Sequence, residues 1–255
     1  MNKKNILLMS IFIGLFTSFY LFKSKSQNNL ITIGTAAAYA PFVSINEQGK
    51  YEGFDIDVAD ALARQMGKKL VVQDMGSMTA LFMALEQGKV DAVIWALSIT
   101  EERLDKVAMI NYQGEKTKTY PLLFWKKIPE NIKSIEDMQG MTICVEPTSA
   151  QDTVAQKYTG ITLKPTENVD DALLNIQFGK VQAAFVEPAI AQKFKKKYPE
   201  IQVLDVELAP EDQVQGMGIA IKKGNTEVIN QIQRAVDELK SKGVISTYEA
   251  KWGIS

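Results

Sequence analysis

The sequence predicts an α/β fold in which mostly parallel sheets carry helices on both faces, arranged as two similar halves. Apolar strand-like segments alternate with helix-like segments along nearly the whole chain, and this alternation is typical of parallel sheets with helical crossovers. An internal similarity is the second observation: ALEQGKVDAVIWALS, residues 84–98, resembles NIQFGKVQAAFVEPA, residues 175–189. Each contains a helix end, Gly-Lys-Val and a buried strand. The 255 residues suffice for two domains, each with its own core.

The first half of the chain supplies strands and helices in turn. We expect strands at 30–35, 69–75 and 89–97, a turn with a short strand at 49–54, and helices at 55–67, 78–88 and 100–106. Asp55 is the expected N-cap of the first helix, and Gly67 follows its end. Asp55 and Asp57 together could suggest a metal site, but two carboxylates at a helix start without a third ligand favour capping.

The second half continues the alternation and ends with a strand and a helix. Its segments lie at 120–126, 141–146, 149–158, 169–179, 180–187, 201–208, 216–222 (strand) and 226–243 (helix). Aligning Gly88 with Gly179 in the internal similarity places Ala96 opposite Glu187. Ligands of open α/β sheets bind beyond the carboxyl ends of strands. If the two halves face each other, one contributes Arg103 and the other Glu187, and this charge pair suits a zwitterion.

Composition excludes several classes of function. The first 26 residues hold four lysines and no acid, which leaves 25 basic and 30 acidic residues, a net charge of −5, in the rest. A mildly acidic body argues against nucleic-acid binding. The chain has no histidine, which excludes Ser-His-Asp and Cys-His catalysis and any histidine metal site. Cys144 is the single cysteine, so no intramolecular disulfide can form. We expect no metal and no cofactor.

Residues 1–26 are predicted to be a signal peptide or N-terminal anchor. A basic start, MNKK, precedes an apolar run at 6–22, and Ser24 and Ser26 give a small-x-small pattern for cleavage after Ser26. No cysteine follows the apolar run, which excludes a lipoprotein anchor. The run is at the lower length limit for a membrane span, so an uncleaved anchor stays open. Either way, we expect the body outside the cytoplasmic membrane, with a periplasmic location.

The stretch WALSITEER, residues 95–103, combines a helix start with an arginine. Ser98 and Glu101 have the spacing of a capping box, and Thr100 is an alternative N-cap. Plain capping accounts for these residues. It does not require Arg103, so this stretch alone favours plain capping and leaves the arginine unexplained.

Four motifs in order carry a resemblance to a known family. They are GTAAAYAPF (34–42), YEGFDIDVADALARQMG (51–67), ALEQGKVDAVIWALSITEER (84–103) and KSKGVISTYEAKWGI (240–254). Through them the chain resembles the periplasmic amino-acid-binding proteins of ABC importers, in the polar-amino-acid branch of the extracellular solute-binding proteins of family 3. The resemblance implies two lobes joined by two crossing strands that close on ligand by a hinge. Lobe 1 would be 27–115 plus 212–255, and lobe 2 would be 116–211.

In lobe 1 the resemblance assigns four residues to the ligand. Arg103 matches the arginine that grips the α-carboxylate, since a guanidinium holds a carboxylate bidentately. Ser98 matches a residue that offers its N–H and hydroxyl at the same helix start. Tyr39 matches an aromatic packed over the ligand side chain, and Met78 an apolar pocket wall. The alternatives are a loop aromatic that covers the core for Tyr39 and ordinary helix packing for Met78.

In lobe 2 the resemblance points to the turn VEPTSAQ and to Glu187. Thr148 and Ser149 fit the family's turn, where the Ser149 amide would give a second anion contact, although Pro147 replaces the usual glycine. Glu187 lies where the family usually has the aspartate that pairs with the ligand α-ammonium. The alternative for Glu187 is a solvated loop acid before Pro188.

Two departures concern the ligand side chain. Family members that bind cationic or amide side chains often have Asp where this chain has Ala36, and Trp95 stands where a small polar residue is common. An aromatic wall could hold a guanidinium or an apolar ligand. Replacement acids could be Glu146, Asp74 or Glu115, each of which could equally be a surface or cap residue. The predicted binding set is Tyr39, Met78, Trp95, Ala96, Ser98, Arg103, Glu146, Thr148, Ser149 and Glu187.

The resemblance implies a monomeric, non-catalytic receptor that delivers a free polar L-amino acid, arginine first, to an ABC permease. Two alternatives share the fold. A cyclohexadienyl dehydratase-like enzyme would need an added acid with a raised pKa, for which Glu146 and Glu187 are candidates. The second alternative is a sensor domain tethered by an uncleaved N-terminal segment.

Overall fold

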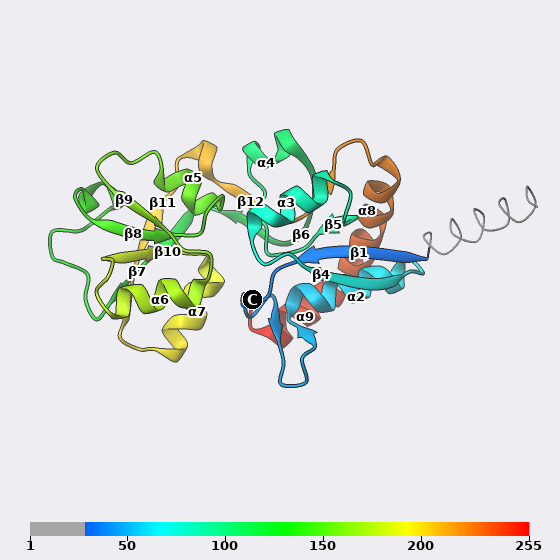
Figure 1. Ribbon diagram of the computed structural model, residues 1–255, viewed down its shortest axis with the longest axis horizontal. Helices are drawn as coiled ribbons and strands as arrows, with labels where there is room; N and C mark the ends of the chain where they lie inside the picture. Colours follow the sequence, from blue (N-terminus) through cyan, green and yellow to red (C-terminus); the bar gives the residue numbers. More distant parts are fainter. Residues whose placement is uncertain (1–28, 255) are drawn as a thin grey trace, which may run out of the picture.

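The computed structural model describes residues 29–254, so the predicted signal peptide or anchor at 1–26 lies outside the described residues. Figure 1 shows two lobes side by side, each built on a sheet flanked by helices. In the described part of the chain, the main sheet of each lobe has five strands. A short hairpin of β2 (Ser44–Ile45) and β3 (Tyr51–Glu52) forms a further, two-stranded sheet. The two-lobe α/β architecture predicted from the sequence is confirmed.

The first sheet holds the N-terminal strands and the strand that returns near the C-terminus. Its order is β4 (Lys69–Asp74), β1 (Leu30–Thr35), β5 (Ala92–Val93), β12 (Val214–Lys222) and β6 (Val107–Thr117). The helices of this lobe are α2 (Phe54–Gln65), α3 (Met78–Glu86), α4 (Glu101–Lys106), α8 (Thr226–Ser241) and α9 (Val244–Trp252).

The second sheet is built from the central part of the chain. Its order is β11 (Ile201–Glu207), β7 (Thr119–Trp125), β10 (Ala183–Phe185), β8 (Thr142–Val145) and β9 (Thr162–Pro165). The helical segments around it are η1 (Ile135–Met138), α5 (Ala150–Ala155), α6 (Val169–Gln177), α7 (Pro188–Lys197) and η2 (Pro210–Asp212).

Strand direction differs in one respect from the prediction of mostly parallel sheets. In the first sheet β1 pairs parallel with β4 and β5, whereas β12 pairs antiparallel with β5 and β6. In the second sheet β8 pairs parallel with β9 and β10, whereas β7 pairs antiparallel with β10 and β11. The sheets are therefore mixed, because the strands next to the crossings run back along their neighbours.

The chain crosses between the sheets twice. β6 ends at Thr117 and β7 begins at Thr119, and the chain returns through η2 into β12. Val214 pairs with Thr117, so the two crossings lie next to each other. This arrangement matches the two crossing strands that the resemblance implied.

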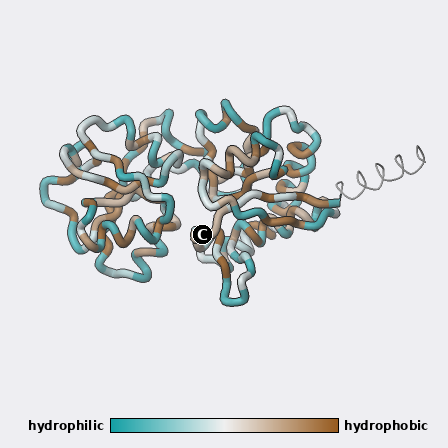
Figure 2. The backbone as a smooth tube through the Cα atoms, viewed as in Figure 1, coloured by the Kyte–Doolittle hydropathy of each residue, from teal (hydrophilic) through white to brown (hydrophobic). Residues whose placement is uncertain are grey.

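Apolar side chains fill both lobes. Figure 2 shows hydrophobic segments inside each lobe and hydrophilic segments along the outer loops. Alternate residues of β7 point to opposite faces of its sheet, as the strand period requires: Leu122 belongs to one buried cluster and Leu123 to the other. A fully buried side chain of this size contributes about 1.5–3 kcal/mol, so both faces of the second sheet stabilise it.

The prediction that Asp55 caps α2 is wrong. The N-cap is Gly53, whose φ of 135° suits glycine, and a Cβ there would lie 2.0 Å from the Phe42 carbonyl oxygen. Asp55 is fully buried instead, and its carboxylate accepts from the Ala96 N–H (2.7 Å) and the Tyr112 hydroxyl (2.6 Å).

Asp57 is also not a cap, since its carboxylate binds the C-terminal helix α9. It accepts from Lys251 Nζ (2.6 Å) and Trp252 Nε1 (2.7 Å). Across residues 29–254, no group of three His, Cys, Asp or Glu side chains could hold a metal ion. The same residues include no helix that is long and apolar enough to cross a membrane.

Candidate functional site

A small cavity of about 10 Å³ lies between the lobes and brings most of the predicted residues together. It is lined by Tyr39, Met78, Trp95, Ala96, Ser98, Arg103, Glu146, Ser149, Ala150, Gln151 and Glu187. Of the predicted set, only Thr148 is not in the lining. Ala150 and Gln151 were missed by the sequence analysis, although both belong to the first turn of α5 directly after Ser149.

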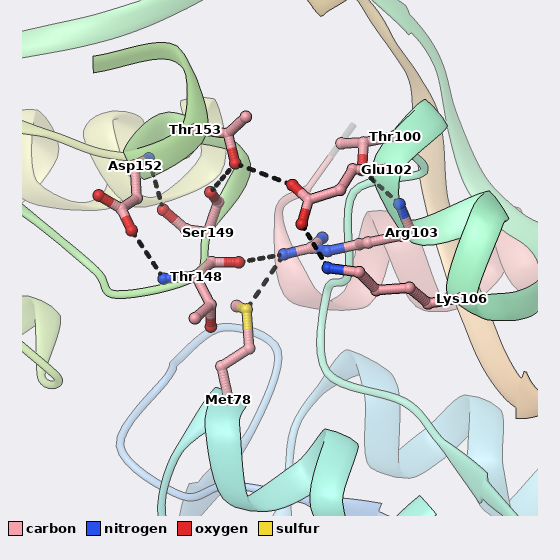
Figure 3. A network of polar contacts seen from close by, with 9 residues as sticks. All are labelled: Met78, Thr100, Glu102, Arg103, Lys106, Thr148, Ser149, Asp152 and Thr153. Atoms are coloured by element: carbon pink, nitrogen blue, oxygen red, sulfur yellow. Dashed lines mark hydrogen bonds and ion pairs between the residues drawn. The ribbon is translucent and has the colours of Figure 1, made fainter. Parts of the chain in front are cut away.

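Arg103 lies on α4 and is held by groups from both lobes (Figure 3). Its Nη1 donates to the Ser98 carbonyl (2.8 Å), and its Nη2 donates to the Thr148 carbonyl (3.0 Å) and to Met78 Sδ (3.0 Å). The guanidinium also lies 5.7 Å from the centre of the Phe82 ring. Burial lowers the pKa of Arg103, which nevertheless stays charged at neutral pH. The cavity therefore contains one fixed positive charge.

Thr100, not Ser98, caps the helix that carries Arg103. The Thr100 hydroxyl accepts from the Arg103 N–H at 3.2 Å. The Ser98 hydroxyl instead donates to Glu187 Oε1 at 2.8 Å, and the Tyr120 hydroxyl donates to Ser98 Oγ at 3.4 Å. The alternative cap predicted from the sequence is thus the one that forms, and it leaves the Ser98 side chain facing the cavity.

Glu187 is a buried acid that connects the lobes. It follows β10, is the N-cap residue of α7 and precedes Pro188, which occupies the first turn of that helix. Its Oε1 accepts from Ser98 Oγ and from Gln151 Nε2, both at 2.8 Å. Burial raises the pKa of Glu187, while these two hydrogen bonds oppose that rise. With 8% of its surface exposed, Glu187 is not the solvated loop acid of the alternative interpretation.

The turn before α5 has the strained geometry that binding turns often show. Thr148 has a φ of 61°, and its N–H donates to Asp152 Oδ2 at 2.9 Å. The Ser149 hydroxyl caps α5 by accepting from the Asp152 N–H at 3.0 Å, as Figure 3 shows. The Ser149 amide, the predicted second anion donor, donates here to the Glu146 carbonyl at 3.2 Å.

Aromatic side chains form the wall on the lobe 1 side. The Tyr39 and Trp95 rings lie 5.0 Å apart with a tilt of 48°, and both residues are buried. The Trp95 Nε1–H is buried and has no hydrogen-bond partner in the part of the chain that the structure describes. Next to it, Ala96 adopts a φ of 44°, which its N–H bond to Asp55 holds in place. Asp55 thus supports the floor of the cavity from below.

Glu146 is the one acid of the three proposed replacements that reaches the cavity. Its Oε1 is buried and has no hydrogen-bond partner among residues 29–254, and burial raises the pKa of Glu146 to about 8. Nearby Arg103 opposes this rise, while Glu187 and Glu167 add to it. Asp74 is exposed and accepts from the Gly76 N–H of its own turn and from the Ala37 N–H. Glu115 is exposed on β6, and neither acid lines the cavity.

Glu146 also lines a second small cavity, of about 10 Å³, that adjoins the first. The two share four residues: Tyr39, Glu146, Gln151 and Glu187. The rest of the second lining comes from lobe 2 and is mostly apolar: Cys144, Val145, Thr166, Val169, Ala172, Phe185 and Val186. The pair of cavities thus has a charged end between the lobes and an apolar end in lobe 2.

Comparison with known proteins gives consistent matches. The model of the family described as "Bacterial extracellular solute-binding proteins, family 3" matches residues 31–255. The chain is 33% identical over 231 residues to the "Probable ABC transporter arginine-binding protein ArtJ" of Chlamydia trachomatis serovar D, covering 90% of this chain and 88% of the relative.

Two solved structures match over nearly their full length. One is "An ancestral arginine-binding protein bound to arginine", with a TM-score of 0.78 and 30% identity, covering 88% of this chain and 98% of that chain. The other is the ancestral amino acid-binding protein AncCDT-1, described as a precursor of cyclohexadienyl dehydratase. It has a TM-score of 0.78 and 26% identity, and the match covers 90% of this chain and 97% of that chain.

Proposed function

The chain belongs to the bacterial extracellular solute-binding proteins of family 3, and on that premise we propose that it binds a free L-amino acid between its lobes and delivers it to an ABC permease. One observation carries the proposal. Arg103 on lobe 1 and Glu187 on lobe 2 are buried at the same cavity with opposite charges. An α-amino acid carries the complementary pair, a carboxylate and an ammonium group, on one carbon.

The α-groups of the ligand would take over contacts that the protein now makes with itself. The carboxylate would bind the Arg103 guanidinium bidentately, together with N–H groups near Ser98 and Ser149. The ammonium would bind Glu187, whose Oε1 at present accepts from Ser98 and Gln151. Because these groups come from both lobes, the ligand makes its full set of contacts only in the closed form, and this difference drives closure.

Arginine is the first candidate among the amino acids. The named relatives support it, since the Chlamydia protein is described as arginine-binding and the ancestral structure contains arginine. The site offers a second reason, because Glu146 gives it one more carboxylate than the α-groups need. Tyr39 and Trp95 supply aromatic faces on which a guanidinium can stack.

The wider assignment follows from the same family. We place the protein outside the cytoplasmic membrane, as a monomer in the periplasm, with residues 1–26 as the export signal or anchor. Lobe 1 would be 27–115 plus 212–255 and lobe 2 would be 116–211. We assign no catalytic activity and no cofactor, in keeping with a family of transport binding proteins.

A second candidate function has one observation in its favour. The pKa of Glu146 is raised to about 8, so its carboxyl is largely protonated at neutral pH and could act as a general acid. The AncCDT-1 likeness links this fold to a dehydratase. Such an enzyme would bind prephenate in the cavity and use Glu146 to protonate the leaving hydroxyl.

A thermal-shift screen separates the two candidates. The protein is refolded from denaturant to remove bound ligand and is then heated with each common L-amino acid and with prephenate. Ligand at 100 times its Kd adds about 2.7 kcal/mol to the unfolding free energy, which gives a clear shift. A shift with one or a few L-amino acids supports the receptor. No shift with any amino acid, together with turnover of prephenate, refutes it in favour of the enzyme.

A further inference from the structure

We propose that Glu146 selects a ligand with a cationic side chain, by pairing its carboxylate with the guanidinium of arginine at the entrance to lobe 2. The inference rests on the proposed function, because it takes the α-groups to lie between Arg103 and Glu187. It assigns the choice of side chain to lobe 2, although the family resemblance leads one to expect an acid at the position of Ala36 in lobe 1.

The shape of the site gives the first argument. Glu146 is one of four residues that line both cavities, so it lies at the junction between the charged end and the apolar end. A ligand whose α-groups occupy the first cavity has its side chain directed towards this junction or past it. The methylene stem between the α-groups and the guanidinium then packs against the first cavity's wall, which includes Tyr39, Met78 and Trp95.

The hydrogen-bond inventory gives the second argument. Glu146 Oε1 is buried and has no partner within the described residues. Buried polar atoms are nearly always hydrogen-bonded, and an unpaired one destabilises the structure that contains it. A guanidinium presents five N–H donors in one plane and can supply the missing bond. Glu146 Oε1 is thus a buried acceptor for which the ligand can supply the donor.

The charge balance gives the third argument. The cavity is lined by one cation, Arg103, and two acids, Glu146 and Glu187. The α-carboxylate and α-ammonium of any amino acid cancel. Because burial raises the pKa of Glu146 to about 8, a neutral side chain leaves this carboxyl mostly protonated at neutral pH and forms no ion pair with it. A cationic side chain favours the ionised carboxylate and pairs with it, since a buried charge is costly without a partner. Ligands such as glutamine or citrulline lack this ion pair.

The other acids near the site do not compete for this task. Asp74 is exposed, and its carboxylate accepts from the Gly76 N–H of its own turn at 2.9 Å. Glu115 and Glu167 are exposed and line neither cavity. Asp55 is buried below the floor and accepts from Tyr112 and Ala96.

The aromatic residue at the junction favours arginine over lysine. Tyr39 lines both cavities and packs against Trp95. A planar guanidinium can stack on such a ring while it forms two parallel hydrogen bonds to a carboxylate, whereas an ammonium group acts as a point charge. We therefore expect the order arginine, lysine, citrulline, with citrulline weakest because it has the shape of arginine without its charge.

The test compares Glu146→Gln with the wild-type protein by isothermal titration calorimetry, using L-arginine and L-citrulline. We expect the wild type to prefer arginine by about 100-fold or more, since truncation of a buried charge partner has effects of this size. In E146Q arginine should lose most of that advantage, while citrulline should bind as well as before. The matched control is Glu167→Gln, which removes the same charge from an exposed position nearby and should leave both affinities unchanged.

The outcomes separate this inference from the proposed function. If E146Q weakens arginine and citrulline equally, Glu146 acts on the fold or on the α-groups and the inference is overturned. If the wild type binds amino acids but does not discriminate arginine from citrulline, the receptor stands and the inference fails. If the wild type binds no amino acid, the proposed function fails, and the inference fails with it. A selective collapse of the preference in E146Q supports both.

Discussion

Replacement of Arg103 by alanine tests the best-defined contact of the proposed site. The Arg103 guanidinium donates to the Ser98 and Thr148 carbonyls, and the residue is only 7% exposed. Water therefore screens it little. Loss of one partner of such a buried charge pair typically costs about 2–5 kcal/mol of binding. With tenfold in Kd for each 1.4 kcal/mol, R103A should weaken L-arginine binding roughly 30- to 3,000-fold.

The assay uses a second ligand to tie the loss to the α-carboxylate. Agmatine has the arginine side chain and amino group but no carboxylate. By calorimetry, R103A should bind agmatine as well as the wild type does, while it loses L-arginine. Arg103→Lys should fall between, because lysine keeps the charge but cannot hold a carboxylate bidentately. Circular dichroism and a cooperative melt of R103A check that the variant is folded.

One result would refute the reasoning. If R103A loses agmatine and L-arginine by the same factor, the arginine acts on the shape of the site and not on the carboxylate. Wild-type affinity of R103A for L-arginine would exclude Arg103 from the site altogether.

Three more predictions concern the remaining charged groups. Glu187→Gln should weaken L-arginine strongly but should have little effect on 5-guanidinopentanoate, which lacks the α-ammonium; equal calorimetric losses would count against the assignment. The affinity for L-arginine should rise between pH 6 and 8, by up to about tenfold per unit, and then level off. The reason is that a cation binds the ionised form of Glu146, whose pKa is raised to about 8; a slope that persists in E146Q would contradict this. Asp55→Asn should lower the unfolding free energy by about 1–3 kcal/mol and weaken ligand binding, because the Ala96 N–H or the Tyr112 hydroxyl loses its acceptor. Tyr112→Phe removes only one of these bonds, so a larger loss of affinity in that variant would refute the supporting role of Asp55.

Local patterns in the sequence predicted the strands and helices that carry the site better than the long-range contacts around them. The alternation of strands and helices gave the two sheets, and the strand ends after β5 and β10 carry Ser98 and Glu187 to one cavity. Each position follows from a short-range rule, since ligand-binding residues of open α/β sheets lie beyond the carboxyl ends of strands.

Long-range contacts are what the sequence analysis missed. A capping pattern at a helix start made Asp55 a cap, but its partner Ala96 lies 41 residues away, and burial in the core decides its role. The antiparallel strands next to the crossings were not predicted for a related reason, because strand direction there depends on how the chain returns between the lobes. Glu146 was in the predicted binding set, but the sequence offered Asp74 and Glu115 as further candidates for the replacement acid; the burial of its Oε1 and the lack of a partner for it in the described residues single it out.

The most direct test of the account is a calorimetric titration of ligand-stripped wild-type protein with L-arginine and with D-arginine. The account predicts one site per chain that binds L-arginine and rejects the D-enantiomer, because Arg103, Glu187 and Glu146 have to reach three groups on one chiral carbon. Binding of neither enantiomer, or equal binding of both, would contradict the proposal that these residues form an amino-acid site.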